Sequence, residues 1–186
     1  MTVSRAEVLA LAAELVANDH LRRHMLATEA IMRALAPRLG GDPDEWAVAG
    51  LGHDLDIEQT EDDFSRHGRI AADLLKERHA GEAVVHAIAA HNPMTGVVAD
   101  DTMSIALIAA DQLSGLITAA ALVRPDKSLL GVAPKSVRKR FKETAFARGV
   151  ERESILRCEE LGLPLDEFIG IGLAAMQAAA ADLGLA

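Results

Sequence analysis

The stretch Trp46-Ala-Val-Ala-Gly-Leu-Gly-His-Asp-Leu55 places a histidine beside an aspartate at the end of an apolar run. Asp42 and Pro43, which precede it, are typical of a helix N-cap and of the first helical position. We therefore predict a helix from Asp42 to about His53, with the His53-Asp54 pair at its C-terminal end. An imidazole and a carboxylate held together provide nitrogen and oxygen ligands that suit a divalent metal ion.

The rest of the chain favours an all-α protein. Half of the 186 residues are hydrophobic, only 3% are aromatic and tyrosine is absent, so we expect a core of Ala, Leu, Ile and Val. Apolar residues recur at helical spacing, and no alternating or β-branched run is long enough to indicate a sheet. Further helices are predicted at about 4–17, 67–77, 81–91, 152–161 and 166–183, with one before Pro37, one starting at Asp101 and a basic one after residue 134.

Composition and charge exclude several classes of protein. The net charge of -9 argues against a nucleic-acid binder, because the chain has no general positive field. Residues 1–19 carry charges and lack the continuous apolar segment of a signal peptide. Cys158 has no partner in the chain for a disulfide, which fits a reducing compartment. The apolar run 105–123 contains Asp111 and indicates a buried helix rather than a membrane span. We predict a cytoplasmic protein without a membrane partner.

Histidines and aspartates on several predicted helices could converge on one metal centre, as ligands in helical bundles do. We predict one site at His24, His53, Asp54 and Asp111 and a second at His67 and His91, with Asp54 bridging the two. For each residue the alternative is a hydrogen-bonded core position or a solvated surface position. His86 is expected to lie behind the ligands or in the core, with an exchange of roles with His91 left open. His20 and His79 are expected at the surface.

The ordered set resembles the HD superfamily of metal-dependent phosphohydrolases over about residues 21–116. The resemblance rests on Gly52-His53-Asp54-Leu55, on residues 67–72 and 88–92, and on Ala109-Ala110-Asp111. It implies a compact all-helical bundle with the metal site among its central helices. We predict a single HD-type domain over residues 1–186, with a helical extension at about 124–186. Leu55-Asp56 stands where the well-known version has Ile-Gly, and no Gly-Tyr-Pro element of the cyclic-dinucleotide phosphodiesterase branch follows.

The resemblance also implies an activity and a cofactor. The expected reaction is hydrolysis of a small phosphate ester or phosphoanhydride, with nucleotides among the candidates, by a metal-bound hydroxide. The expected cofactor is one or two divalent ions (Mn, Fe, Co, Mg, Ni or Zn). Two alternatives stay open: a mixed-valence di-iron oxygenase of the same superfamily, and a nucleotide-binding or regulatory module without turnover. A homodimer through the Ala-rich residues 169–181 is a further possibility.

Charged residues outside the ligand set supply candidates for catalysis and for phosphate binding. Asp54 is expected to bridge the metals, and Asp56 or Glu58 to position water or protonate a leaving group. The segment from Arg124 to Arg148 holds eight of the 19 basic residues in an acidic chain. It could clamp a substrate phosphate or form a solvated helix face. The candidate phosphate contacts are Arg69, Arg124, Lys127, Lys135, Lys139 and Lys142.

Overall fold

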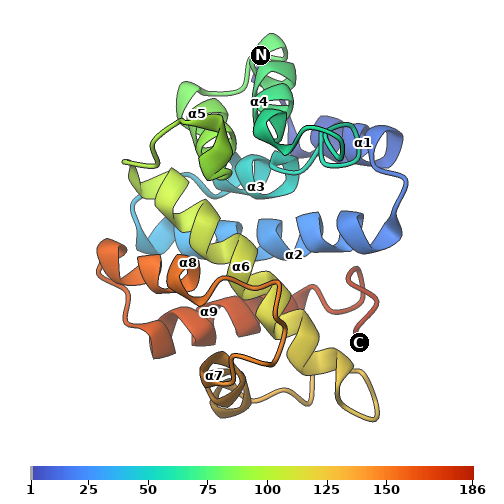
Figure 1. Ribbon diagram of the computed structural model, residues 1–186, viewed down its shortest axis with the longest axis vertical. Helices are drawn as coiled ribbons and strands as arrows, with labels where there is room; N and C mark the ends of the chain where they lie inside the picture. The colour runs from blue at the N-terminus through green and yellow to red at the C-terminus, as the bar shows by residue number, and fades with distance from the viewer. Residues whose placement is uncertain (1) are drawn as a thin grey trace.

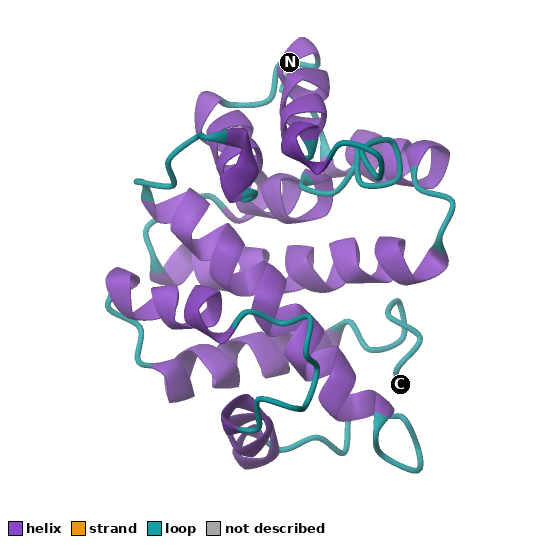
Figure 2. Ribbon diagram, in the orientation of Figure 1, coloured by secondary structure: helices purple, strands orange, loops and turns teal. Residues whose placement is uncertain are grey.

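The computed structural model describes residues 2–186, so the predicted domain boundary at Met1 lies outside the described residues. Those residues form α-helices joined by loops and short 3-10 turns, with no strand among them (Figure 2), which confirms the all-α prediction. The helices are α1 (Arg5–Leu15), α2 (Asp19–Leu35), α3 (Pro43–Gly52), α4 (Arg69–Glu77), α5 (Glu82–Ala90), α6 (Thr102–Leu122), α7 (Pro134–Lys142), α8 (Arg152–Leu156) and α9 (Leu165–Ala178). The 3-10 turns are η1 (Ala36–Arg38), η2 (Phe64–Arg66), η3 (Pro93–Thr95) and η4 (Arg157–Leu161).

Two long helices form the centre of the molecule. Helix α6 crosses α2, with α1, α3, α4 and α5 towards one end and α7, α8 and α9 towards the other (Figure 1). Helix α6 is long and apolar enough by composition to span a membrane, but 56% of its most apolar window is buried inside the protein. It is therefore a core helix of this fold, as its interrupted apolar run predicts.

The α2–α3 contact positions the two helices that carry His24 and His53. A Cβ atom at Gly50 on α3 would lie 2.8 Å from the Cα atom of Glu29 on α2, so only glycine permits this close approach. Fully buried side chains continue the core on both sides of the contact, among them Met25, Leu51 and Leu113. The close packing fixes the distance between the two helices, and with it the distance between their histidines.

The predicted helix ends agree with the structure except at α4 and at the C-terminal helices. Gly68, and not His67, is the N-cap of α4, because a left-handed φ of +86° there is accessible to glycine. The helix predicted at 152–161 divides into α8 and η4. Val137, Ile155 and Phe168 of the C-terminal helices belong to the same hydrophobic core as the helices of the N-terminal half. The extension thus packs directly on the helices that carry the predicted ligands.

Candidate metal centre

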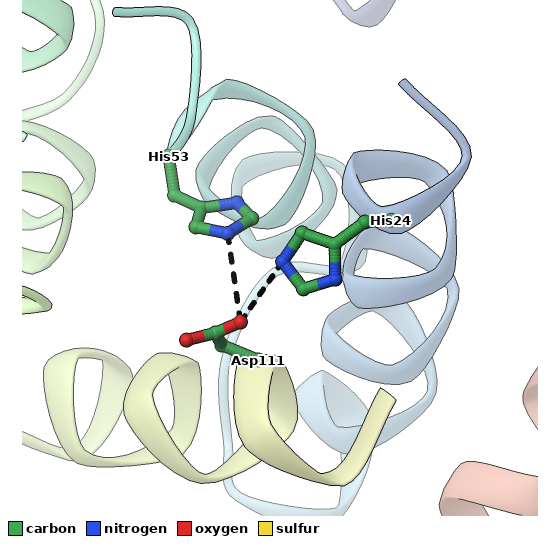
Figure 3. Close-up of side chains that lie close together, drawn as sticks. All are labelled: His24, His53 and Asp111. Carbon is green, nitrogen blue, oxygen red and sulfur yellow. Dashed lines mark ion pairs between the residues drawn. The ribbon is translucent and has the colours of Figure 1, made fainter. Parts of the chain in front are cut away.

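The predicted ligands converge where α2, α3, α5 and α6 meet. His24 lies on α2, Asp111 lies on α6, and His53 and His91 directly follow the last residues of α3 and α5. The Nε2 atom of His24 lies 2.9 Å from Asp111 Oδ1, and Nε2 of His53 lies 3.9 Å from the same oxygen. Figure 3 shows both rings turned towards this carboxylate from separate helices. These three side chains form one group that could hold a metal ion.

Asp54 lies between this group and a second one. Its Oδ1 atom is 3.3 Å from Nε2 of His53, 3.3 Å from Nε2 of His67 and 3.6 Å from Nε2 of His91. Its Oδ2 atom is 3.6 Å from Nε2 of His24. The two oxygens of Asp54 therefore face different histidines, which is the placement that a bridging carboxylate requires.

Backbone carbonyls orient two of the four histidines, the backbone-anchored pair His53 and His91. His53 Nδ1 donates to the carbonyl oxygen of Gly50 at 2.8 Å, and His91 Nδ1 donates to that of Ile88 at 2.6 Å. Because a carbonyl oxygen only accepts, the hydrogen of each neutral ring lies on Nδ1 and the lone pair on Nε2. The lone pair of His53 faces Asp54, and that of His91 accepts from Nε2 of His67 at 3.0 Å and lies 3.6 Å from Asp54 Oδ1. Both nitrogens are therefore free of a proton, as metal coordination requires.

Side chains orient the other two histidines, the side-chain-anchored pair His24 and His67. His24 Nδ1 lies 3.0 Å from Ser114 Oγ, whose own hydrogen is donated to the carbonyl of Asp111, so the serine oxygen accepts from His24. His67 Nδ1 donates to Asp56 Oδ1 at 2.8 Å. All four rings therefore turn Nε2 to the same centre and are held from behind at Nδ1.

The electrostatics of the centre fit a divalent cation. Burial lowers the pKa of His53 to about 4, and its Nε2 is a buried atom without a hydrogen-bond partner in the described chain. Burial would raise the pKa of Asp54 and Asp111, but the neighbouring histidines hold the pKa of both carboxyl groups below its usual range. A neutral nitrogen without a partner and two ionised carboxylates form a donor set that suits a divalent cation.

The side-chain-anchored histidines behave differently from His53. Burial opposes the charged form of His24, but the hydrogen bond and charge of Asp111 outweigh it and raise the pKa of His24 to about 9. Burial also opposes the charged form of His67, whose hydrogen bonds to Asp54 and Asp56 raise its pKa to about 9. A metal ion bound at neutral pH must therefore displace protons from these two rings.

Comparison with known proteins identifies the family of this chain. The family model described as "HD domain" matches residues 21–122, which include every predicted ligand. The chain belongs to the HD-domain family. Membership indicates metal-dependent phosphohydrolase activity in general. The resemblance found in the sequence is thus confirmed at the level of the family.

Curated relatives match the same part of this HD-domain chain. It is similar to ribonuclease Y of Oleidesulfovibrio alaskensis, with 31% identity over 98 residues, and to ribonuclease Y of Nitratidesulfovibrio vulgaris, with 30% identity over 102 residues. Each match covers 53% of this chain and 18% of the relative, so the chain spans less than a fifth of the length of these relatives. No solved structure matches the chain.

Asp56 of this HD domain lies behind the metal centre and not in it, which corrects its predicted catalytic role. Besides His67, its carboxylate accepts hydrogen bonds at 2.9 Å from the backbone N–H groups of Gly68 and Ala71. Asp56 is 1% exposed. The carboxylate is held by these donors because it faces the first turn of α4, where N–H groups lack helical partners. It positions His67 and caps α4.

Glu58 is also placed away from the centre. Its carboxylate accepts hydrogen bonds at 2.8 Å from the backbone N–H groups of Ala17 and Asn18, next to the start of α2. These hydrogen bonds lower the pKa of Glu58, because they favour its charged form. Glu58 thus ties the loop after His53 to the helix that carries His24, and the prediction of a catalytic carboxylate here is wrong in its geometry.

The predicted phosphate contacts lie elsewhere as well. Lys135, Lys139 and Lys142 belong to α7, which packs on α6 and α9 at the end of the molecule opposite α4 and α5 (Figure 1). Arg124 pairs with Asp126 beside the exposed Lys127, and Arg69 donates to the carbonyl of Thr95. The basic residues are clustered in the sequence, but the packing of α7 places its lysines away from the predicted metal ligands.

The remaining histidines do not join the centre. His86 Nε2 donates to the carbonyl of Val98 at 3.0 Å and lies 3.4 Å from a carboxylate oxygen of Asp101. Asp101 is the N-cap of α6 and accepts from the first turn of that helix. His20 and His79 are exposed, as predicted. The alternative that His86 replaces His91 as a ligand is therefore wrong.

A cavity of about 620 Å³ opens onto the metal centre, a size typical of small-molecule sites. Asp54, His67, His91 and Asp111 line its floor. The sequence reading missed the rest of its wall, which comes from η2, the loop after η3 and the segment 151–157 of the extension. The lining residues missed include Phe64, Val98, Gln112, Glu151, Ser154 and Arg157. Gln112 directly follows Asp111, and Asn92 of the segment 88–92 also lines the cavity.

Proposed function

We propose that this HD-domain protein hydrolyses a small phosphate ester or phosphoanhydride with one or two divalent metal ions bound among its four histidines. One observation carries the proposal: the unpartnered, buried Nε2 of His53 faces two ionised carboxylates at the floor of a cavity sized for a small molecule. The family indicates metal-dependent phosphohydrolase activity in general, and the cavity supports a small substrate.

The bound ions would supply a water-derived nucleophile at neutral pH and Lewis acidity towards the phosphoryl oxygens. The chain's own contribution is to fix the donors. His53 and His91 are held by backbone carbonyls, so their Nε2 atoms carry the lone pairs and face the centre. Asp54 faces both histidine groups and would hold two ions at a fixed separation.

Asp111 is oriented from the second half of the chain. Gln112 Nε2 donates to Asp111 Oδ2 at 2.9 Å, and Gln112 Oε1 accepts from the backbone N–H of Glu151 at 2.8 Å. The glutamine therefore connects a predicted ligand to the segment that walls the cavity. This connection would fix the position of the cavity wall relative to the metal ions.

The relatives named ribonuclease Y make RNA a second candidate substrate. Two properties of this chain weigh against a long RNA strand. The net charge is -9, and Arg157 is the only arginine or lysine among the described residues that line the cavity. RNA binding along the phosphate backbone relies on several such cations. We therefore favour a small phosphate compound and keep RNA as an arm of the test.

The test is phosphate or nucleotide release after reconstitution, in turn, with manganese, iron, cobalt, magnesium, nickel and zinc. The panel contains small phosphate monoesters, nucleoside mono-, di- and triphosphates and a short single-stranded RNA. Asp54→Ala should abolish release, whereas Asp62→Ala, an exposed aspartate of the same loop, should retain it.

Three results would reject the proposal. RNA cleavage without turnover of any small ester would favour the nuclease. Iron-dependent oxygen uptake without phosphate release would favour the oxygenase alternative. Tight nucleotide binding without turnover under any of the metals would favour a regulatory module.

A further inference from the structure

The cavity lining contains two chemically different sets of side chains. The first belongs to the metal centre, with Asp54 and Asp111 as its charged groups. The second, here called the apolar end, consists of apolar side chains from three separate segments, which include Ile57, Phe64, Val97, Val98, Ala99 and Ile108. Of these, Phe64 is 45% exposed and Val98 is 70% exposed, so both side chains have apolar surface free for a ligand. An apolar surface of this kind at the mouth of a polar site indicates a ligand with an apolar part.

Phe64 links the apolar end to the metal centre. Its ring stacks on the ring of His67, with the centroids 4.6 Å apart and the planes 28° from parallel. The buried Asn92 fixes this arrangement, because its Nδ2 donates to the carbonyls of Phe64 at 2.7 Å and His67 at 3.0 Å. The phenyl ring is thus held directly beside a predicted metal ligand, with nearly half of its surface free.

The charges around the cavity limit the substrate to few negative groups. Within residues 2–186, Arg157 is the only arginine or lysine that lines the cavity, and its guanidinium is already bound to Glu160 at 2.9 Å and to the carbonyl of Ala99 at 3.1 Å. Glu151 adds a negative charge to the same wall. Each phosphate beyond the one at the metal centre would lie at the apolar end without a free cation, where an unpaired charge is costly.

We propose that the apolar end is a leaving-group subsite, in which Phe64 and Val98 select phosphate monoesters of an aromatic or apolar, uncharged alcohol over polyphosphates and over esters of polar alcohols. This inference rests on the proposed function for the reaction itself and adds the substrate class. Phe64 is a specificity-determining residue here, because its ring faces the alcohol part of the ester. Water attacks phosphorus, the bond between phosphorus and the bridging oxygen breaks, and the alcohol leaves with that oxygen.

Binding tests the subsite without any turnover. Phenylphosphonate and methylphosphonate carry the same headgroup but differ in their organic part, and neither can be hydrolysed as an ester. Isothermal titration of the manganese-loaded protein should give roughly tenfold tighter binding of phenylphosphonate, as expected for stacking and burial of one ring. Phe64→Ala should reduce this ratio to about one. Leu130→Ala removes another exposed apolar side chain, which lies outside the cavity, and should leave the ratio unchanged.

Equal affinities of the two phosphonates, or a ratio that survives in Phe64→Ala, would overturn the subsite. If circular dichroism shows that Phe64→Ala is unfolded, Val98→Asp replaces it, because a charge at this exposed position should weaken phenylphosphonate binding and leave methylphosphonate binding nearly unchanged. A Val98→Asp protein that still prefers phenylphosphonate by the full ratio would also overturn it.

Measurements of turnover distinguish a failure of the subsite proposal from a failure of the proposed function. The value of kcat/KM for phenyl phosphate should exceed that for glycerol phosphate and for a nucleoside triphosphate by roughly tenfold or more. Metal-dependent release at equal rates from all three would overturn the subsite and leave the proposed function intact. No release from any ester, together with a Phe64-dependent phenylphosphonate preference, would reject the function and support the subsite.

Discussion

The two pairs of histidines in the metal centre are held by different means. The backbone-anchored pair, His53 and His91, follows the ends of α3 and α5, and each ring is hydrogen-bonded to the carbonyl three residues earlier. The side-chain-anchored pair, His24 and His67, depends on Ser114 and Asp56. The ring orientation of His53 and His91 thus depends on the backbone at the helix ends. The ring orientation of His24 and His67 can be changed by a single substitution of Ser114 or Asp56. The pKa shifts of three of the rings also differ, since His24 and His67 each have a pKa raised to about 9 and His53 has one lowered to about 4.

The largest effect is expected from removal of a backbone-anchored ring. His53→Ala deletes the neutral nitrogen that lies against both Asp54 and Asp111, and leaves the two carboxylates without it. We expect metal-dependent activity to fall by roughly a thousandfold or more, with metal content measured by elemental analysis falling in parallel. His20→Ala, which removes an exposed ring on α2, is the matched control. A His53→Ala protein that keeps its full metal content would show that the centre does not depend on this ring.

The second effect concerns pH and belongs to the side-chain-anchored pair. His24 and His67 hold protons below their raised pKa of about 9, and metal binding must release these protons. Metal affinity should therefore rise as the pH rises from 6.5 towards 9, by about tenfold per pH unit for each proton released, and level off above 9. Titration of the metal at several pH values in buffers of different ionisation enthalpy measures both the affinity and the number of protons. An affinity independent of pH over this range would mean that neither ring carries a proton.

The third effect comes from the carboxylate behind His67. Asp56→Ala frees the His67 ring and leaves the N–H groups of Gly68 and Ala71 without partners. We expect metal affinity to fall by about 10- to 100-fold and the free energy of unfolding to fall by about 1–3 kcal/mol. Metal titration and urea unfolding measure the two losses, with Glu61→Ala in the same loop as the control. Loss of stability with unchanged metal affinity would show that Asp56 only caps α4.

The smallest effect is expected at the serine behind His24. Ser114→Ala removes one neutral hydrogen bond to His24 Nδ1 and leaves the contact between His24 and Asp111 in place. We expect metal affinity to fall by about tenfold or less, which titration can resolve. A larger loss of metal affinity in Ser114→Ala than in Asp56→Ala would contradict the expectation that Asp56 contributes more to metal binding than Ser114.

The sequence was most informative where chemistry follows from local spacing. The apolar composition predicts helices, and Asp42-Pro43 correctly starts the helix that ends at the His53-Asp54 pair. The family follows from the order of histidines and aspartates along the chain, and that order also predicts the ligand set. These features are local, or depend only on the residue types that a metal accepts.

The sequence was least informative for charged residues whose contacts depend on tertiary packing. Asp56 and Glu58 lie two positions apart beside the doublet, yet one caps α4 and the other lies at the start of α2. The basic segment is distinctive in composition, but only the packing of α7 decides that it faces away from the ligands. Phe64 and Arg157 reach the cavity through tertiary packing and carry no local signal of that role.

The hydrogen bonds of Gln112 have a consequence for how this chain can diverge. Its side chain joins Asp111 to the backbone of Glu151, so the ligand-bearing helix and the C-terminal segment share one amide group. If the segment 151–157 were lengthened, exchanged or lost during evolution, Gln112 Oε1 would lose its hydrogen-bond partner. The side chain of Asp111, which Gln112 orients, would then be held less firmly, although it is distant from that segment in the sequence. Position 112 should therefore change together with this segment among relatives, while the histidines stay fixed.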